Sequence, residues 1–300
     1  MTYLVAYHHD HSCEIKSAWQ QPNSTEFFYF NNHINILEYQ ESLYIGYSWA
    51  NHIDNKLQLD DSIIDYIASI EQKKITICQH ISWEKLLGVW KEMKIDIIYV
   101  SHYCKNTNNP SIKPWPLYAS SVENMSSHNN KIKENRKYFV SFIGCHRYDY
   151  RSNIRLDLNN YFHKNHYNNI YFELYDHWFY DRNIYGHKPI SDDQIKRIQQ
   201  YNEIVSDSVF SLCPEGTGPN TIRVWESMAL GSIPVIYSDD WEPPKLKDMS
   251  WDEFSIFIPQ KEYNQTMDIL NSINKEKIQL MQQNCIKAYE QFKNMNCWNI

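Results

Sequence analysis

Short apolar runs that end in polar clusters recur along the chain, and they have the length and composition of β-strands. These runs are Thr2–His8, Lys74–His80, Ile95–His102, Lys137–Gly144, Asn168–Tyr175, Ser208–Cys213 and Ser232–Asp239. Apolar residues at helical spacing between or after them predict helices at Ser82–Met93, Asp192–Tyr201, Thr221–Leu230 and Lys275–Phe292. The alternation of strands and helices predicts an α/β fold whose parallel sheets are covered by helices.

A polar, charge-rich segment from Ala119 to Arg136 separates two groups of predicted elements. We place a domain boundary in this segment, so that residues 1–130 and 131–300 form one domain each. The alternative is a long surface loop within a single domain. A chain of 300 residues is long enough to build two cores. The last predicted helix, Lys275–Phe292, could pack on its own domain or cross back to the first.

Charge and cysteine content narrow the class of protein. The formal net charge is −7 and the isoelectric point is about 6, which argues against a general nucleic-acid surface but leaves room for a local phosphate pocket. The seven cysteines are scattered and form no C-x-x-C pair, so neither a disulfide framework nor a structural zinc site is predicted. Without a basic and apolar leader or a long apolar run, we expect a cytoplasmic protein, with peripheral contact at the inner face of the membrane left open.

The stretch from Ser211 to Trp241, SLCPEGTGPNTIRVWESMALGSIPVIYSDDW, carries the clearest chemical signal. It predicts a strand and a helix joined by PEGTGPN, in which Gly216 and Gly218 allow a sharp turn and close approach of the backbone to a ligand. Asn220 or Thr221 would cap the helix, and free amide N–H groups at a helix start favour an anion. The loop and the helix start therefore predict a phosphate site.

Arg223 and Glu226 extend this predicted site. An arginine in the first turn opposes the helix dipole unless an anion lies close by, and its planar fork can hold two phosphate oxygens. Glu226 follows on the same helix face, where its carboxylate can accept both hydroxyls of a ribose. The alternative is an ordinary surface pair. Ser238, Asp239 and Asp240 follow the next strand at the ligand-binding edge of the sheet, where the aspartates would meet sugar hydroxyls or form a turn.

The same stretch resembles the signature of the exostosin-type glycosyltransferases. The matching positions are Cys213, Gly216, Gly218, Thr221, Arg223, Glu226, Gly231, Ile233, Pro234, Val235, Ser238 and Asp239. Phe142–Leu158 is similar to the family's Phe-x-Gly strand end and arginine-bearing helix, and the similarity covers about Lys137–Phe292. Glu215 departs from the pattern, since a basic residue often stands there in the family.

The resemblance implies a GT-B architecture, in which two Rossmann-like domains face a cleft. The C-terminal domain would bind a nucleotide sugar, usually a UDP-sugar, and the N-terminal domain an oligosaccharide or lipid-linked glycan acceptor. It implies inversion at the anomeric carbon without an obligatory metal ion or other cofactor, in a bacterial or viral enzyme that extends a surface polysaccharide, lipopolysaccharide or capsule. Gly144, Arg147 and Arg151 would flank the phosphates, whereas Arg155 is expected on a solvated face or in a salt bridge.

An inverting displacement needs a base near the attacking hydroxyl. The first predicted strand ends in His8, His9 and Asp10, at the sheet end where sites form in parallel α/β folds. We favour Asp10 as the base, with His9 and His8 next, and an exposed loop is the alternative. His80 and His102 follow two other strands and could line the same cleft. A GDP-fucose-type GT-B transferase, and a non-catalytic protein that binds a nucleotide sugar or glycan, stay open as other functions.

Overall fold

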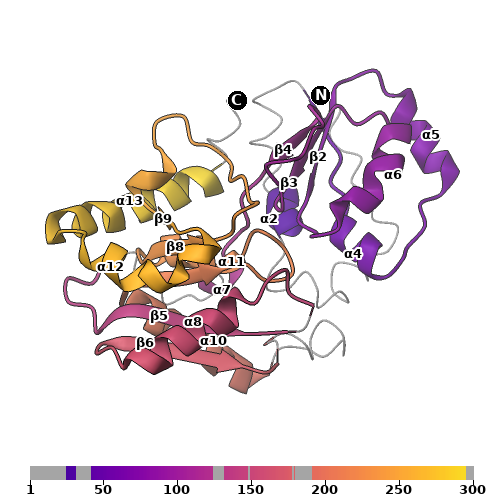
Figure 1. The fold of residues 1–300 in the computed structure, drawn as a ribbon. Helices are drawn as coiled ribbons and strands as arrows, with labels where there is room; N and C mark the ends of the chain where they lie inside the picture. The colour runs from indigo at the N-terminus through magenta and orange to yellow at the C-terminus, as the bar shows by residue number, and fades with distance from the viewer. Residues whose placement is uncertain are drawn as a thin grey trace. The chain divides into compact units, whose positions relative to one another are not determined.

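The chain divides into two compact units, Met1–Tyr118 with Glu242–Pro244 and Ala119–Trp241 with Lys245–Ile300. The computed structural model describes residues 25–31, 42–123, 132–147, 149–177, 179 and 191–294 (Figure 1). Helix α7 (Ser120–Glu123) belongs to the second unit, although a division at residue 130 would assign it to the first. The reason is that Ser121 donates a hydrogen bond to Glu226, and Lys293 Nζ lies 3.2 Å from Glu123 Oε1.

The first unit contains a parallel sheet in the order β1-β2-β3-β4. Its strands are β1 (Leu43–Tyr44), β2 (Lys74–Cys78), β3 (Ile97–Val100) and β4 (Ile112–Pro114). Its helices are α2 (Thr25–Asn31), α4 (Trp49–Asp54), α5 (Asp61–Ser69), η1 (Trp83–Leu86) and α6 (Leu87–Glu92). Trp49 and Trp90 are buried edge to face in its core, and the indole N–H of Trp49 donates to Thr76 Oγ1 on β2 (2.7 Å).

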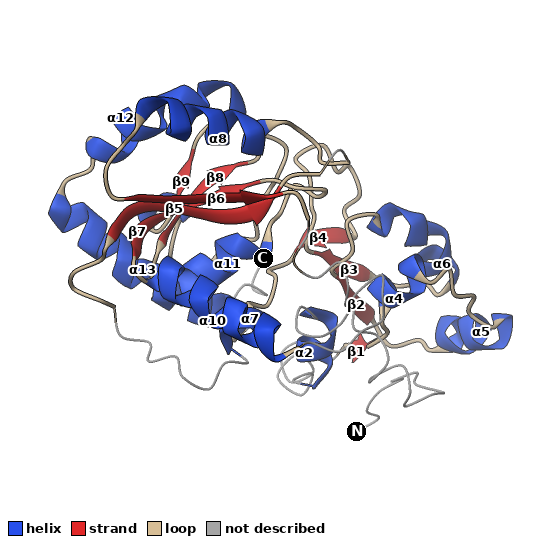
Figure 2. Ribbon diagram, turned by 90° about the horizontal axis from the view of Figure 1, so that it is seen from below, coloured by secondary structure: helices blue, strands red, loops and turns tan. Residues whose placement is uncertain are grey.

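The second unit contains a parallel sheet in the order β6-β5-β7-β8-β9. Its strands are β5 (Tyr138–Cys145), β6 (Ile170–Tyr175), β7 (Ser208–Pro214), β8 (Ile233–Tyr237) and β9 (Ile256–Phe257). Besides α7, its helices are α8 (Ile154–Asn165), α10 (Asp192–Ser206), α11 (Ile222–Ala229), η2 (Trp251–Glu253), η3 (Gln260–Gln265), α12 (Thr266–Asn271) and α13 (Lys275–Lys293). Figure 2 shows α8 and α12 on one face of this sheet and α10, α11 and α13 on the other.

The predicted fold class is confirmed, since both units are α/β with parallel sheets, as in the GT-B architecture. The cleft between domains stays a prediction. Helix α13 contacts α11 and β8 of its own unit. The predicted helix at Ser82–Met93 divides into η1 and α6, and the predicted strand Thr2–His8 lies outside the described residues. The short strands β1 and β4 were not predicted, because two or three residues carry too little apolar pattern.

Glu26 on α2 is a buried carboxyl group that joins three segments of the first unit. Its carboxylate oxygens both lie 3.2 Å from the amide nitrogen of Ala50, and Oε1 also accepts from the amide of Gln79 (2.9 Å). Burial raises the pKa of Glu26 to about 8, although these amide donors favour the charged form and lower it. The proton on this carboxyl group therefore binds more tightly in the folded protein than in the unfolded chain.

We expect this proton to make stability fall as the pH rises. A carboxyl group whose folded-state pKa lies above its ordinary 4.5 contributes stability that is present below pH 4.5 and is lost through about pH 8. Urea unfolding of the full chain should show a free energy of unfolding lower at pH 8 than at pH 5, on the order of 3 kcal/mol from this group. Glu26→Gln should flatten that dependence, whereas the control Glu92→Gln, at an exposed position on α6, should not. Equal pH dependence in both variants would contradict the assignment.

Candidate functional site

The carboxyl ends of three neighbouring strands bring most of the predicted donor-site residues together in the second unit. β7 pairs in parallel with β5 on one side and with β8 on the other, so the loops after these strands leave the same edge of the sheet. Gly144 lies near the end of β5, and Gly216 and Gly218 lie in the loop between β7 and α11. Residues 238–240 follow β8. The predicted convergence of these segments is therefore observed.

Arg223, in the first turn of α11, is buried with part of its hydrogen-bonding capacity unused. Its side chain is 8% exposed, and its guanidinium carbon lies 4.6 Å from the centroid of the Phe142 ring. One terminal nitrogen donates to the carbonyl oxygen of Ile143. Its Nε and Nη1 atoms are buried without a hydrogen-bond partner among the described residues. A buried cation with two unsatisfied donor nitrogens is costly unless an anion joins it.

Gly144 leaves the space that this guanidinium and the ring of Phe142 occupy. A Cβ atom built on Gly144 would lie 2.7 Å from Arg223 Nη2 and 2.9 Å from Phe142 Cζ. Real Cβ atoms do not approach heavy atoms so closely, so a larger residue would push the guanidinium or the ring aside. The Phe-x-Gly pattern at residues 142–144 thus supplies both the ring under Arg223 and the space beside it.

The start of α11 is not capped by the side chains that we expected to cap it. Thr221 occupies the N-cap position with extended backbone, but its side chain makes no capping hydrogen bond. The side chain of Asn220 instead accepts a hydrogen bond from Trp225 Nε1 (3.0 Å). The predicted side-chain cap is therefore wrong, because the buried indole N–H of Trp225 needs the amide oxygen as its partner.

Glu226 is buried and bonded to two other helices. One carboxylate oxygen accepts from the hydroxyl of Ser121 on α7, and the other accepts from Tyr201 Oη on α10 (2.7 Å). Burial raises the pKa of Glu226, while these two donors and the charge of Arg223 oppose that rise. An exposed surface pair of Arg223 and Glu226 is ruled out, because both side chains are buried. The ribose contact of Glu226 stays a prediction.

Arg155 on α8 is a buried residue whose role the sequence did not reveal. It donates to the backbone carbonyl oxygens of Cys145 (2.7 Å), Glu215 (2.9 Å) and Pro214 (3.3 Å). The expected solvated face or salt bridge is wrong, because Arg155 lies on the buried side of α8 and fastens the ends of β5 and β7 together. Burial, followed by the nearby charge of Arg223, lowers its pKa to about 10. A Cβ atom on Gly216 would lie 2.9 Å from Arg155 Nη2, so a larger residue there would shift the guanidinium of Arg155.

The other two predicted phosphate-binding arginines have carboxylate partners. Arg147 Nε lies 3.0 Å from Asp149 Oδ1. Arg151 Nη2 lies 2.8 Å from Asp240 Oδ2, and Arg151 Nε lies 3.6 Å from Glu215 Oε2. Their contact with phosphate stays a prediction, but it would require these arginines to share or exchange a carboxylate.

Two further predicted residues after β8 have hydrogen-bond partners within the second unit. Ser238 Oγ donates to Glu215 Oε2 (3.2 Å), and Asp239 Oδ1 accepts from the backbone amide of Gln260 (3.1 Å). Asp239 therefore joins the end of β8 to the start of η3, a long-range contact that is not the local turn named as the alternative, and its contact with a sugar hydroxyl stays a prediction.

The predicted base and its neighbours, Asp10, His9 and His8, lie outside the described residues. His80 lies within them, after β2. Its Nδ1 accepts from the amide of Ser82 (2.9 Å), so the ring proton resides on Nε2 and faces Asp54 Oδ1 (3.1 Å). Both ring nitrogens of His80 therefore have partners within the first unit.

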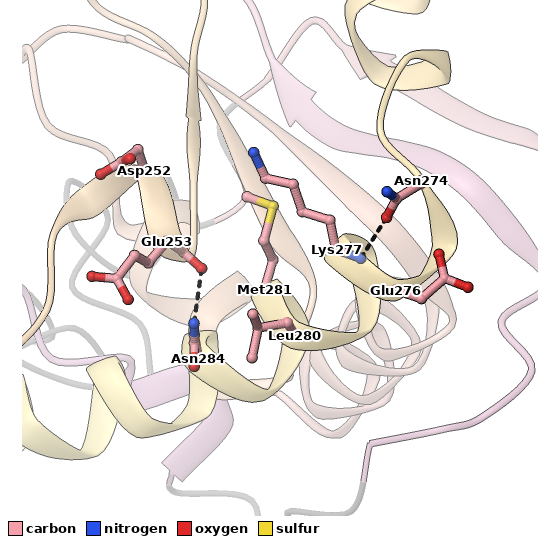
Figure 3. A pocket seen from close by; sticks show the side chains of 8 residues that line it. All are labelled: Asp252, Glu253, Asn274, Glu276, Lys277, Leu280, Met281 and Asn284. Carbon is pink, nitrogen blue, oxygen red and sulfur yellow. Dashed lines mark hydrogen bonds between the residues drawn. The ribbon is translucent and has the colours of Figure 1, made fainter.

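A hollow of about 480 Å³ lies elsewhere in the second unit, beside η2 and the start of α13 (Figure 3). It is lined by Asp252, Glu253, Asn274, Glu276, Lys277, Leu280, Met281 and Asn284, none of which is a predicted site residue.

Within the described ranges, no cluster of three or more histidine, cysteine or acidic side chains could hold a metal ion. No helix in that part of the chain is long and apolar enough to cross a membrane. Metal independence stays a prediction.

One protein family and several named plant proteins match this chain in sequence. The family described as the Exostosin GT47 domain matches residues 73–273. The probable glucuronosyltransferase GUT1 of Oryza sativa subsp. japonica is 34% identical over 94 residues, which are 31% of this chain and 22% of that protein. The probable beta-1,4-xylosyltransferase IRX10 of Arabidopsis thaliana is 32% identical over 94 residues, or 31% of this chain and 23% of that protein. The matches thus span less than a quarter of these relatives.

Solved structures give more distant likenesses. The pneumococcal O-GlcNAc transferase GtfA, in complex with UDP and GlcNAc, has a TM-score of 0.46 and 9% identity over 90% of this chain and 57% of that chain. T4 phage BGT, in complex with UDP-glucose, has a TM-score of 0.39 and 14% identity over 90% of this chain and 85% of that chain. The assignment of this chain to a family rests on the match to the Exostosin GT47 domain and not on these structures. That match covers two-thirds of the chain and includes Arg223 and Glu226. The chain belongs to the exostosin GT47 family.

Proposed function

We propose that the protein is a glycosyltransferase that moves a sugar from a nucleotide sugar, with UDP as the nucleotide, to a glycan acceptor. The observation that carries this proposal is the buried guanidinium of Arg223, whose Nε and Nη1 lack a partner among the described residues. Arg223 lies in the first turn of α11, where the free amide N–H groups and the dipole of the helix favour an anion. A diphosphate supplies the charge and the acceptor oxygens that this guanidinium needs.

The same geometry suits the departure of a nucleoside diphosphate. When the bond to the sugar breaks, negative charge grows on the phosphate oxygens, and fixed dipoles and cations stabilise that charge. The guanidinium of Arg223 already packs on the ring of Phe142 beside Gly144 in the free protein. We propose that these groups replace an obligatory metal ion as the source of positive charge. The transfer is an inverting displacement, and the base that takes the acceptor's proton is Asp10, with His9 and His8 as its neighbours.

The names of the matched relatives support a proposal for the class of sugar. The matched proteins of Oryza sativa and Arabidopsis thaliana are named as glucuronosyltransferases and xylosyltransferases. We propose that this chain transfers a sugar from a UDP-sugar and extends a polysaccharide, in surface polysaccharide, lipopolysaccharide or capsule synthesis. The acceptor is an oligosaccharide or a lipid-linked glycan, reached from the cytoplasm with peripheral contact at the membrane.

Thermal unfolding of the full chain with a panel of nucleotides tests this function. The panel contains UDP, GDP, UDP-glucose, UDP-N-acetylglucosamine, UDP-xylose, UDP-glucuronic acid, GDP-fucose and GDP-mannose. A ligand that binds only the folded state raises the melting temperature, so UDP and at least one UDP-sugar should do so. Stabilisation by the GDP compounds alone would favour a GDP-fucose-type transferase instead. No stabilisation by any nucleotide would reject the donor site.

A further inference from the structure

Arg151 lies between two carboxylates at the edge of the proposed donor site. Its Nη2 is 2.8 Å from Asp240 Oδ2, and its Nε is 3.6 Å from Glu215 Oε2. Its backbone amide donates to the carbonyl oxygen of Gly216 (3.0 Å). Arg151 therefore joins the loops that follow β5, β7 and β8. The positive charge of Arg151 is thus shared by the carboxylates of Asp240 and Glu215.

This cluster borders the site of Arg223. The loop to which Arg151 is bonded leads directly into α11, and Gly216 in that loop lies against Arg155. The guanidinium of Arg155 lies 5.9 Å from the Phe142 ring, and that of Arg223 lies 4.6 Å from the same ring. Arg155 is already bonded to three carbonyl oxygens, whereas the guanidinium of Arg151 is paired with carboxylates that a phosphate oxygen of the diphosphate could replace.

The two carboxylates differ in how easily they could release Arg151. The side chain of Glu215 is 5% exposed, whereas that of Asp240 is 68% exposed. Depriving a buried carboxylate of its partner shifts an equilibrium by roughly a hundredfold or more. Breaking an exposed pair shifts it by less than about fivefold, because water solvates the released charge. An arriving phosphate would therefore displace Asp240 and leave Glu215 paired.

We propose that Asp240 is an internal competitor of the donor's diphosphate, holding Arg151 in the free protein and yielding it to a phosphate oxygen when the nucleotide binds. This inference rests on the proposed function, because it takes the ligand to be a nucleoside diphosphate. Asp240 then lowers donor affinity instead of adding to it, contrary to the expectation that its carboxylate meets a sugar hydroxyl. Glu215 keeps Arg151 at the site in both states.

Titration of the full chain with UDP by calorimetry tests the proposal. Asp240→Asn should lower the Kd for UDP by about two- to fivefold, since the competing exposed charge is gone. Asp248→Asn removes one negative charge from an exposed position in the same connection after β8 and serves as the matched control. It should leave the Kd within about 1.5-fold of the original value.

A double-substitution cycle distinguishes competition for Arg151 from a general charge effect. In an Arg151→Gln background, Asp240→Asn should give no gain in affinity, because the contested guanidinium is absent. Should Arg151→Gln fail to fold, Arg151→Lys provides a second background, in which the gain should shrink because the planar fork is lost. An equal gain from Asp240→Asn and Asp248→Asn, or a gain that persists without Arg151, would overturn the proposal while UDP binding stands. Absence of UDP binding in the original protein would overturn the proposed function, and this inference with it.

Discussion

Replacing Arg223 with alanine is expected to weaken UDP binding by roughly 1.5–3 kcal/mol, or about ten- to 150-fold in Kd. The Nε and Nη1 atoms of this buried guanidinium lack a partner in the described part of the chain, so its loss removes the charge-assisted bonds that these atoms would make to the diphosphate. Isothermal calorimetry with UDP on the full chain measures the change. Normal UDP affinity in this variant would defeat the assignment of the donor site.

Three further variants separate the contribution of Arg223 from general effects. Arg223→Lys keeps the charge but loses the planar fork, so it should restore only part of the affinity. Gly144→Ala should also weaken binding, because the added Cβ atom would lie 2.7 Å from Arg223 Nη2 and displace the guanidinium. Arg197→Ala, at an exposed position on α10, removes an arginine outside the site and should bind UDP normally. Circular dichroism and the melting temperature confirm that each variant is folded before its affinity is compared.

Replacing Asp10 with asparagine is expected to stop transfer while UDP binding stays intact. A general base contributes about 10²–10⁴-fold to turnover, and asparagine cannot accept the proton of the acceptor hydroxyl. Turnover is measured as UDP released from the UDP-sugar that stabilises the protein, with an acceptor oligosaccharide present. Asp10 lies outside the described residues, so this prediction rests on the sequence pattern and the mechanism alone.

His9→Gln is the matched comparison for Asp10→Asn. If Asp10 takes the proton and His9 only supports it, His9→Gln should lower turnover less than Asp10→Asn does. A larger loss in His9→Gln would transfer the base role to the histidine. Unimpaired turnover in Asp10→Asn would remove Asp10 from that role.

The elements around the donor site could be predicted because local signals there agree. β7, α11 and β8 each combine a clear apolar pattern with glycine or proline at their ends, so their order and boundaries follow from neighbouring residues. The parallel pairing of these strands then requires that the loops carrying Gly216 and Asp240 share one edge of the sheet.

The partners of individual side chains could not be predicted in the same way. Asn220 is a residue type that often caps helices, yet its side chain accepts a hydrogen bond from Trp225. Without this bond the indole N–H of Trp225 would be buried without a partner. Arg155 has the appearance of a surface residue, yet it binds carbonyl oxygens more than fifty positions along the chain at Pro214 and Glu215. Such contacts depend on tertiary packing, which no local pattern encodes.

The way in which Arg155 is bonded has a consequence for how this protein can change over evolution. Arg155 donates hydrogen bonds to main-chain carbonyl oxygens, which every amino acid carries. These three bonds therefore do not depend on the side chains of Cys145, Pro214 or Glu215. A substitution at one of these positions therefore acts through the contacts of the side chain itself, such as that of the Glu215 carboxylate with Arg151, and not through the bonds to Arg155. Exchange of Glu215 for a basic residue would remove the buried partner of Arg151 and change the charge beside the donor site, while the bonds of Arg155 that join the ends of β5 and β7 would stay available.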